Sequence, residues 1–244
     1  MPLPSMTVPT YDFELPSTGE KINYRPFLVK EQKLMLIAQE GGDEKEALEA
    51  IKQILENCCL NPDIKINELP LFDIEFFFLQ LRSKSVGEKV QLYFRHQLCP
   101  KNDGQPSNTQ TEIEVDLNEV KVQTDPSHNK KIDLNDGVGM IMKYPKVDSL
   151  ANIDFKNQDN LDGIIKFIGN CIEKIYDKNE MYTQQDYTPE ELNEFITNLT
   201  EDQFNKIQNF FDTSPKIKHL VNFKCADCGI EDKLEVEGIQ SFFI

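Results

Sequence analysis

A densely apolar stretch, Phe72-Asp-Ile-Glu-Phe-Phe-Phe-Leu-Gln-Leu-Arg-Ser-Lys-Ser-Val-Gly87, dominates the first half of this sequence. On a helix that starts after Pro70, one face carries four large apolar side chains: Ile74, Phe77, Phe78 and Leu81. Three further apolar side chains fall outside that face: Phe72, Phe76 and Leu79. A helix that is apolar most of the way round needs partners on two sides. We therefore expect it at the centre of the amino-terminal half.

The segments before this helix predict an arm followed by a helical hairpin. Five prolines in residues 1–28 indicate an extended arm, with short β pieces at Tyr11–Leu15 and Lys21–Tyr24 joined by a turn. Helical periodicity begins near Leu28 and stops at Gly41-Gly42, and a second helix is expected to start after Asp43 as its N-cap. We expect these two helices to pair.

The segments after the central helix alternate between strand and helix patterns. Strand patterns cover Lys89–Arg95, parts of Thr111–Val122 and Gly137–Tyr144, which favours a small, mostly antiparallel sheet. Helical spacing then runs from Ile164 to Ile175. Two further helices are expected to begin at the N-caps Thr188 and Thr200, and Lys216–Phe243 predicts a terminal β-hairpin.

These elements predict an α+β fold with amino-terminal helices, a small antiparallel sheet, a helical segment and a carboxyl-terminal β-hairpin. We expect residues 1–28 to form the arm, 29–150 the helical hairpin, central helix and sheet, and 151–244 the helical segment with the terminal hairpin. The last two segments are expected to pack as one unit.

Charge and composition narrow the function. The chain of 244 residues has 26 Lys and Arg against 42 Asp and Glu, a net charge of −16, which disfavours non-specific nucleic-acid binding. Sixteen Phe and seven Tyr predict a folded protein. The start lacks a secretory pattern and no 18-residue apolar stretch occurs, so we expect a protein without a membrane span that stays where it is made. Six cysteines then predict free or metal-binding thiols.

Two strand-turn-strand segments carry candidate metal ligands. The second holds Cys225-Ala-Asp-Cys228-Gly229, and the first offers Cys99 with His96 at the same two-residue spacing. If the two turns meet, these four side chains can hold one tetrahedral Zn²⁺, as in a zinc ribbon. The alternative is a pair of reduced cysteines in an ordinary β-turn. A thioredoxin-type redox role is the weaker option, because strand patterns flank Cys225 and Cys228 on both sides.

No constellation predicts catalysis. Among the histidines, His128 lies in a polar loop and His219 in a strand, and neither accompanies a nucleophile pattern. Acidic pairs such as Glu190-Glu191 stand at helix starts, where they favour the helix dipole. Phosphate-binding glycine loops and zinc-protease motifs are absent from the sequence. We therefore predict no catalytic residues and a protein that is not an enzyme.

Three blocks carry a resemblance to a known family. They are Leu15-Pro-Ser-Thr-Gly-Glu-Lys-Ile-Asn-Tyr-Arg-Pro-Phe-Leu-Val-Lys-Glu31, the Phe72–Gly87 stretch and the ending Glu237-Gly-Ile-Gln-Ser-Phe-Phe243. In this order they resemble the baseplate hub assembly proteins of T-even-type contractile-tailed bacteriophages, from about Thr7 to the carboxyl terminus. Cysteine pairs often follow the strand equivalent to Lys89–Arg95 in that family, whereas this chain has only Cys99 there.

The resemblance implies a late viral protein that acts as an assembly chaperone for the contractile tail. Its partners would be phage baseplate hub proteins, met in the host cytoplasm, and its presence in the finished virion stays open. Four aromatic residues near chain ends or loops are candidate interface anchors, or are pinned into the core instead: Tyr24, Phe27, Phe242 and Phe243.

Two other functions remain as alternatives. One is a zinc-ribbon adaptor that binds nucleic acid or a transcription complex. A basic face formed by Lys216, Lys218, His219 and Lys224 would support this function. The other is a small hydrolase, for which no set of residues stands out.

Overall fold

The computed structural model describes residues 6–41, 44–150 and 161–238, and it has the predicted α+β fold. The chain divides into two compact units. Unit 1 comprises Met1–Ile66, Phe72–Gln123 and Lys216–Ile244, and unit 2 comprises Asn67–Leu71 and Thr124–Pro215. The predicted boundaries at residues 28 and 150 differ from this division, because the chain leaves unit 1 after Gln123 and returns to it at Lys216.

The described part of the amino-terminal segment, expected as an extended arm with short β pieces, forms a packed hairpin. Strand β1 (Tyr11–Glu14) pairs antiparallel with β2 (Lys21–Tyr24). The turn closes with a hydrogen bond of 2.8 Å from the Gly19 N–H to the Leu15 carbonyl, and Gly19 has a φ of 73°, which glycine adopts without a steric penalty. Leu15 and Ile22 are buried, so the segment expected at 1–28 forms part of unit 1.

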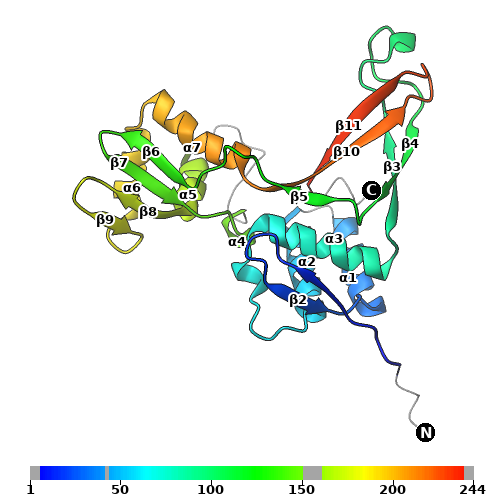
Figure 1. Cartoon of the computed structure of the whole chain (residues 1–244), viewed down its shortest axis with the longest axis horizontal. Helices are drawn as coiled ribbons and strands as arrows, with labels where there is room; N and C mark the ends of the chain where they lie inside the picture. The colour runs from blue at the N-terminus through cyan, green and yellow to red at the C-terminus, as the bar shows by residue number, and fades with distance from the viewer. Residues whose placement is uncertain (1–5, 42–43, 151–160, 239–244) are drawn as a thin grey trace. The chain divides into compact units, whose positions relative to one another are not determined.

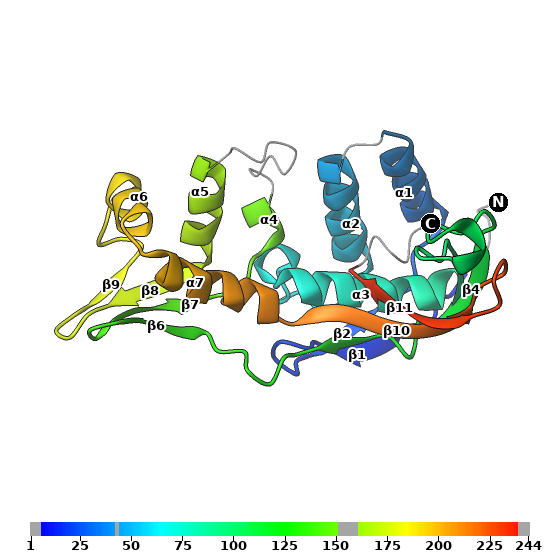
Figure 2. The same ribbon diagram turned by 90° about the horizontal axis from the view of Figure 1, so that it is seen from above.

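The helices of unit 1 are α1 (Val29–Gly41), α2 (Glu44–Cys58) and α3 (Leu71–Ser85). Helices α1 and α2 pair as predicted, and α3 lies between them and the β1–β2 hairpin (Figure 2). Phe77 and Phe78 of α3 are both 0% exposed, which confirms that this helix is central. The Phe13 ring contacts Phe77 with centroids 5.0 Å apart. The N-cap predicted at Asp43 lies outside the described residues.

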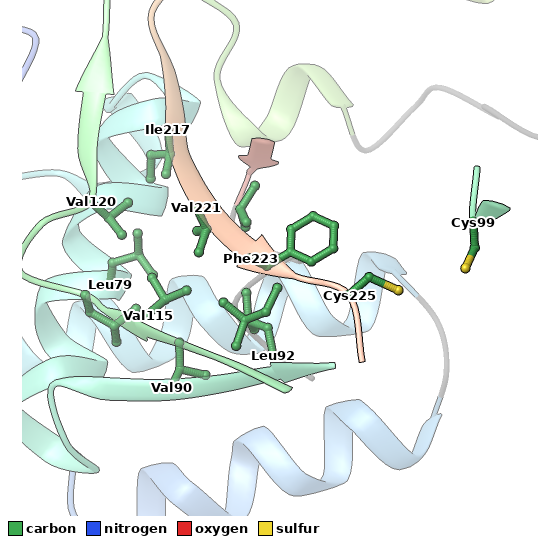
Figure 3. Close-up of a cluster of buried hydrophobic side chains, with 13 residues drawn as sticks. Leu79, Val90, Leu92, Cys99, Val115, Val120, Ile217, Val221, Phe223 and Cys225 are labelled. Carbon is green, nitrogen blue, oxygen red and sulfur yellow. The ribbon is translucent and has the colours of Figure 1, made fainter. Parts of the chain in front are cut away.

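The β structure of unit 1 consists of antiparallel pairs. Strand β3 (Lys89–Phe94) pairs with β4 (Thr111–Asp116), with the 3₁₀ turn Pro100–Asn102 in their connection. A second sheet has three strands in the order β11 (Glu231–Glu237), β10 (Lys216–Lys224) and β5 (Lys121–Gln123). Alternate residues of these strands form one apolar cluster with Leu79 of α3 (Figure 3). That cluster brings the two hairpins side by side (Figure 1).

Unit 2 has a sheet with sequential strand order and helices packed on it (Figure 1). Its strands are β6 (Lys131–Asn135), β7 (Val138–Met142), β8 (Ile172–Tyr176) and β9 (Met181–Thr183). Its helices are α4 (Val147–Leu150), α5 (Leu161–Cys171), α6 (Pro189–Thr197) and α7 (Glu201–Thr213), and a 3₁₀ turn, Ile66–Glu68, falls at the boundary of the units. Complete capping boxes at Thr188 and Thr200 confirm both predicted helix starts.

One helix prediction extends too far. Helical spacing continued to Ile175, but α5 ends at Cys171, and Ile172 begins strand β8. Strand β8 pairs with β7, placing Ile175 opposite Met140. Isoleucine suits a pleated, half-buried surface, so the sheet partner outweighs the helical spacing here. Strand β6 carried no predicted element. None of the helices that the structure describes has the length and apolar character needed to cross a membrane.

Candidate metal centre

Four side chains with metal-binding atoms converge where the turns of two hairpins meet. His96 and Cys99 come from the β3–β4 connection, and Cys225 and Cys228 from the β10–β11 turn. Their three sulfur atoms and one imidazole nitrogen all lie within 4.8 Å of one another. Sequence spacing predicted this set on the condition that the turns meet, and the fold brings them together. We call these residues the Cys3His cluster.

The first turn is closed around Cys99. The Cys99 N–H donates to the Gln105 carbonyl at 3.1 Å, and the Cys99 carbonyl accepts a bond of 3.1 Å from the Gly104 N–H. Gly104 has a φ of 75°, in the left-handed region. Buried Ser107 holds the His96 backbone by two bonds, accepting from the His96 N–H with its hydroxyl and donating its own N–H to the His96 carbonyl. Both ligand-bearing residues therefore have fixed backbones.

The second turn repeats the same closure around Cys225. The Cys225 N–H donates to the Ile230 carbonyl at 2.9 Å, and the Gly229 N–H donates to the Cys225 carbonyl at 2.9 Å. Gly229 has a φ of 74°. In each turn a left-handed glycine bonds the cysteine carbonyl and the residue after that glycine accepts from the cysteine N–H. Glycine is favoured at this place because other residues are strained there.

Two hydrogen bonds tie the turns to each other. The Ala226 N–H donates to Thr111 Oγ1 at 3.0 Å, and the Thr109 N–H donates to Asp227 Oδ2 at 2.8 Å. Cys99 and Cys225 also belong to the apolar cluster of unit 1, and Figure 3 shows them beyond the Phe223 ring at one end of that cluster. Packing and hydrogen bonds thus hold the ligands together.

His96 has a defined orientation. It is buried, and its ring stands edge-on to Phe223 with centroids 6.0 Å apart. Nδ1 lies 3.4 Å from Cys228 Sγ, while Nε2 lies 3.4 Å from Asp232 Oδ2. One nitrogen therefore faces the thiols and the other faces a carboxylate.

The thiols differ in acidity. The backbone N–H of Cys228, helped by the N–H of Asp227, outweighs burial and lowers the pKa of Cys225 to about 6. Burial raises the pKa of Cys99. Because the thiolate is the form that binds metals, Cys225 is the cysteine of this pair that is better prepared as a ligand.

The arrangement suits metal binding better than dithiol redox chemistry. A thioredoxin-type dithiol stands at a helix start, whose dipole stabilises the thiolate. Here Cys225 and Cys228 lie in the turn between β10 and β11. The six cysteines of the chain are free thiols in the structure.

The four predicted partner-binding residues do not share one environment. Tyr24 is 1% exposed and its hydroxyl donates to the Gln80 carbonyl, so of the two alternatives for this residue the structure shows the core position. Burial raises its pKa to about 12. Phe27 is half-buried and lines a hollow beside α1. Phe242 and Phe243 lie outside the described residues.

Two lysines on the terminal hairpin, Lys216 and Lys218, are paired with acids. Lys218 Nζ lies 2.8 Å from Glu235 Oε1 and 3.2 Å from Glu237 Oε2. Lys216 Nζ lies 3.3 Å from Glu237 Oε1. Because β11 places glutamates beside these two lysines, their charges are offset within the hairpin, which disfavours phosphate binding at this position.

A polar hollow in unit 2 was not foreseen from the sequence. It has a volume of about 370 Å³, and Asp133, Asp202, Lys131 and Lys206 are among its lining residues. Lys206 Nζ donates to the Asp133 carbonyl at 2.8 Å and to Asn135 Oδ1 at 3.1 Å. This lysine therefore holds α7 to β6, a structural role.

Two residues that support the Cys3His cluster have no sequence signal of that role. Asp232 lies opposite Phe223 in the β10–β11 register, and Ser107 lies in the connection between β3 and β4. Neither has a spacing that marks it as a partner of His96. Only the register of the hairpin and the path of the loop bring them to it.

Comparison with known proteins identifies the family. Residues 8–244 match the model of the T4 bacteriophage base plate protein family. The match runs through both units and includes the whole Cys3His cluster. Neither the curated proteins nor the solved structures gave a match. The chain therefore belongs to the T4 bacteriophage base plate protein family.

Proposed function

We propose that this protein assists assembly of the phage baseplate hub through protein–protein contacts, in the host cytoplasm and without catalysing a reaction. The observation that carries the proposal is the family match over residues 8–244, which runs through both units. The three sequence blocks that resemble hub assembly proteins point to the hub among the parts of the baseplate. Its partners are phage baseplate hub proteins.

Charge supports a protein partner over nucleic acid. The net charge of −16 repels a phosphate backbone, and Lys216 and Lys218 of the terminal hairpin are paired with glutamates. The same charge keeps a free assembly factor soluble until it meets its partner.

An exposed apolar surface on unit 1 is the contact area that we assign to a hub protein. The hollow beside α1 has a volume of about 660 Å³ and includes Phe27, Leu28, Val29 and Val86 in its lining. Val29 is 82% exposed and Val86 63%. Exposed Leu36 lies seven residues after Val29, on the same face of α1. We call these five residues the α1 patch. Apolar patches of this kind are typical of protein interaction sites.

The α1 patch revises the predicted contact surface. The Leu15–Glu31 block was expected to contribute Tyr24 and Phe27, but Tyr24 is buried, whereas Phe27 is half-buried and the adjacent Leu28 and Val29 are exposed. Phe27, Leu28 and Val29 are therefore its candidate contacts.

Deletion of the gene in the phage tests the proposal. Infected cells should then accumulate unjoined hub components and lack complete baseplates, while heads and tail fibres form. Wild-type protein supplied from a plasmid should restore tails. Normal tails in the deletion phage would contradict the proposal.

Surface variants locate the contact. The double variant Val29→Asp, Val86→Asp should fail to restore tails and should lose hub proteins in co-purification from infected cells. The control is Met181→Asp, which alters an exposed apolar residue of unit 2. Both variants should keep the circular dichroism of the wild type. Preferential binding of purified wild-type protein to duplex DNA at physiological salt would favour the zinc-ribbon adaptor instead.

A further inference from the structure

We propose that the Cys3His cluster binds one structural zinc ion through three thiolates and Nδ1 of His96, with Asp232 accepting a hydrogen bond from Nε2–H of His96. The ion joins the β3–β4 connection to the β10–β11 turn. This site is independent of the baseplate function proposed above.

The ligand atoms converge although they come from distant parts of the sequence. His96 and Cys228 are 132 positions apart in the sequence, yet Nδ1 and Sγ lie 3.4 Å apart. In tetrahedral zinc sites, bonds of about 2.0–2.3 Å place the ligand atoms roughly 3.3–3.8 Å from one another. The four ligand atoms here lie within 4.8 Å of one another. Small side-chain rotations are enough to close them around one ion.

The Cys3His cluster is largely shielded from solvent. Cys99, Cys225 and His96 are buried, and Cys228 is partly buried. Four protein ligands fill a tetrahedral shell, whereas a catalytic zinc keeps a position open for water or substrate. The site is therefore structural.

The His96 ring has the orientation of a metal ligand. Nδ1 faces Cys228 and Nε2 faces Asp232. Histidine ligands in proteins commonly donate their second N–H to a carboxylate, which fixes the ring and strengthens the metal bond. Asp232 is a positioning residue, since it acts on the ion through His96.

The ligand set selects the metal. Thiolate and imidazole ligands disfavour Ca²⁺ and Mg²⁺, which take oxygen ligands. A tetrahedral set of three sulfurs and one nitrogen is a usual structural zinc shell. On binding, Zn–S and Zn–N bonds form and the protons carried by the thiols pass to solvent. The step needs no oxidant or reductant.

Metal analysis of the full-length protein is the direct test. Protein purified without added metal and without a metal-affinity tag should contain one zinc per chain by elemental mass spectrometry. Cys99→Ser and Cys225→Ser should each lose this zinc. Cys59→Ser is the matched control, because Cys59 is a free thiol outside the cluster, and it should keep one zinc per chain.

A second variant tests the site without removing a ligand. The Asp232 side chain is 52% exposed, so Asp232→Asn should fold. In competition with a chromogenic chelator, its zinc affinity should fall by about 10- to 100-fold. Glu231→Gln, an exposed charge removal on the same strand, should leave the affinity unchanged. Co²⁺ bound to the wild type should give the visible absorption of a tetrahedral thiolate site, and Asp232→Asn should shift these bands.

Four results would overturn the proposal. The first is reduced wild-type protein that fails to retain one equivalent of added zinc, and the second is wild-type protein that holds iron in place of zinc. The third is full zinc content in both Cys99→Ser and Cys225→Ser. The fourth is an Asp232→Asn variant that matches the wild type in zinc affinity and Co²⁺ spectrum. If the cysteine variants do not fold, the metal content of the wild type and the Asp232→Asn measurements decide.

Discussion

Unit 1 and unit 2 are built from the sequence in opposite ways. Unit 2 takes nearly all its residues from the continuous segment Thr124–Pro215, and its sheet follows the order of the chain. Unit 1 joins three segments, and its apolar cluster packs α3 against strands from both sides of the unit 2 insertion. Unit 1 therefore depends on contacts between residues far apart in the sequence. Unit 2 depends more on contacts between elements that follow one another in the chain.

The polar contacts of unit 1 join distant segments, whereas unit 2 combines local capping boxes with longer-range bonds such as the one from Lys206 to the Asp133 carbonyl. In unit 1, buried Asp73 accepts hydrogen bonds from the N–H and the hydroxyl of Ser17, and buried Glu31 pairs with Arg25 at 3.0 Å. Both pairs lie within the two blocks that carry most of the family resemblance. In unit 2, the capping boxes at α6 and α7 act within single turns. The resemblance blocks thus contain groups that hold unit 1 together internally.

The largest expected effect comes from the centre of each unit. Phe77→Ala should lower the free energy of unfolding by about 3–5 kcal/mol, because the ring is fully buried and its loss leaves a cavity. Hydrogen exchange should show the loss in unit 1, whereas Phe210→Ala should show it in unit 2. Phe77→Leu, which keeps most of the volume, should cost less. Stability of Phe77→Ala equal to the wild type would contradict the central position of α3.

The second-largest expected effect is a loss of stability on zinc removal, which should affect unit 1 and leave unit 2 unchanged. Free zinc at about 1,000 times its dissociation constant stabilises the folded protein by about 4 kcal/mol, and a chelator cancels this term. Faster hydrogen exchange is expected in residues 95–111 and 222–231, with unit 2 unchanged. Equal acceleration in both units would show that the effect is not local to the Cys3His cluster.

Loss of the buried ion pair should have a somewhat smaller, pH-dependent effect. Glu31→Gln leaves Arg25 without its charge partner and should cost about 3 kcal/mol at pH 7. Burial raises the pKa of Glu31, but hydrogen bonds from Arg25 and the Leu28 N–H outweigh it and hold the pKa below 4.5. The pair therefore stabilises the fold fully above pH 4.5, and this contribution is lost as the pH falls through the lowered pKa.

Urea denaturation of wild type and Glu31→Gln between pH 7 and pH 3 measures this difference. The stability gap between the two proteins should shrink as the pH falls. Glu56→Gln, an exposed acid on α2, is the control and should stay within about 0.5 kcal/mol of the wild type. A gap that is independent of pH would argue against an ionised pair.

The smallest expected effect comes from removing the N-cap of α7 in unit 2. Thr200→Ala removes the hydroxyl that accepts from the Gln203 N–H and should cost about 1 kcal/mol. Gln208→Ala, at an exposed position of the same helix, should change stability by less than about 0.5 kcal/mol. Hydrogen exchange should place the Thr200→Ala effect in α7, and an effect spread over unit 1 would contradict the separation of the units.

Sequence patterns predicted most of the helices and strands, but few of the contacts by which these pack and pair. The apolar spacing of Phe72–Leu81 and the caps at Thr188 and Thr200 are local properties, and each matches the structure. The helical spacing predicted as far as Ile175 was wrong beyond Cys171, because helical and strand spacing both suit the Ile164–Ile175 run. Pairing of Ile175 with Met140 on β7 decides between them, and no local pattern contains that information.

The sequence by itself determined the α+β class, the helix starts, the hairpin turns and the identity of the four cluster residues, because periodicity, caps and the two-residue ligand spacing are short-range properties. Only the tertiary structure decided that the two turns meet, that Asp232 faces His96 and that Tyr24 lies in the core. The meeting of the turns depends on apolar burial between segments more than 100 residues apart, such as Leu92 and Phe223 in one cluster, and the burial of Tyr24 depends on the distant Phe77 of α3. Burial of that kind is a property of the assembled fold.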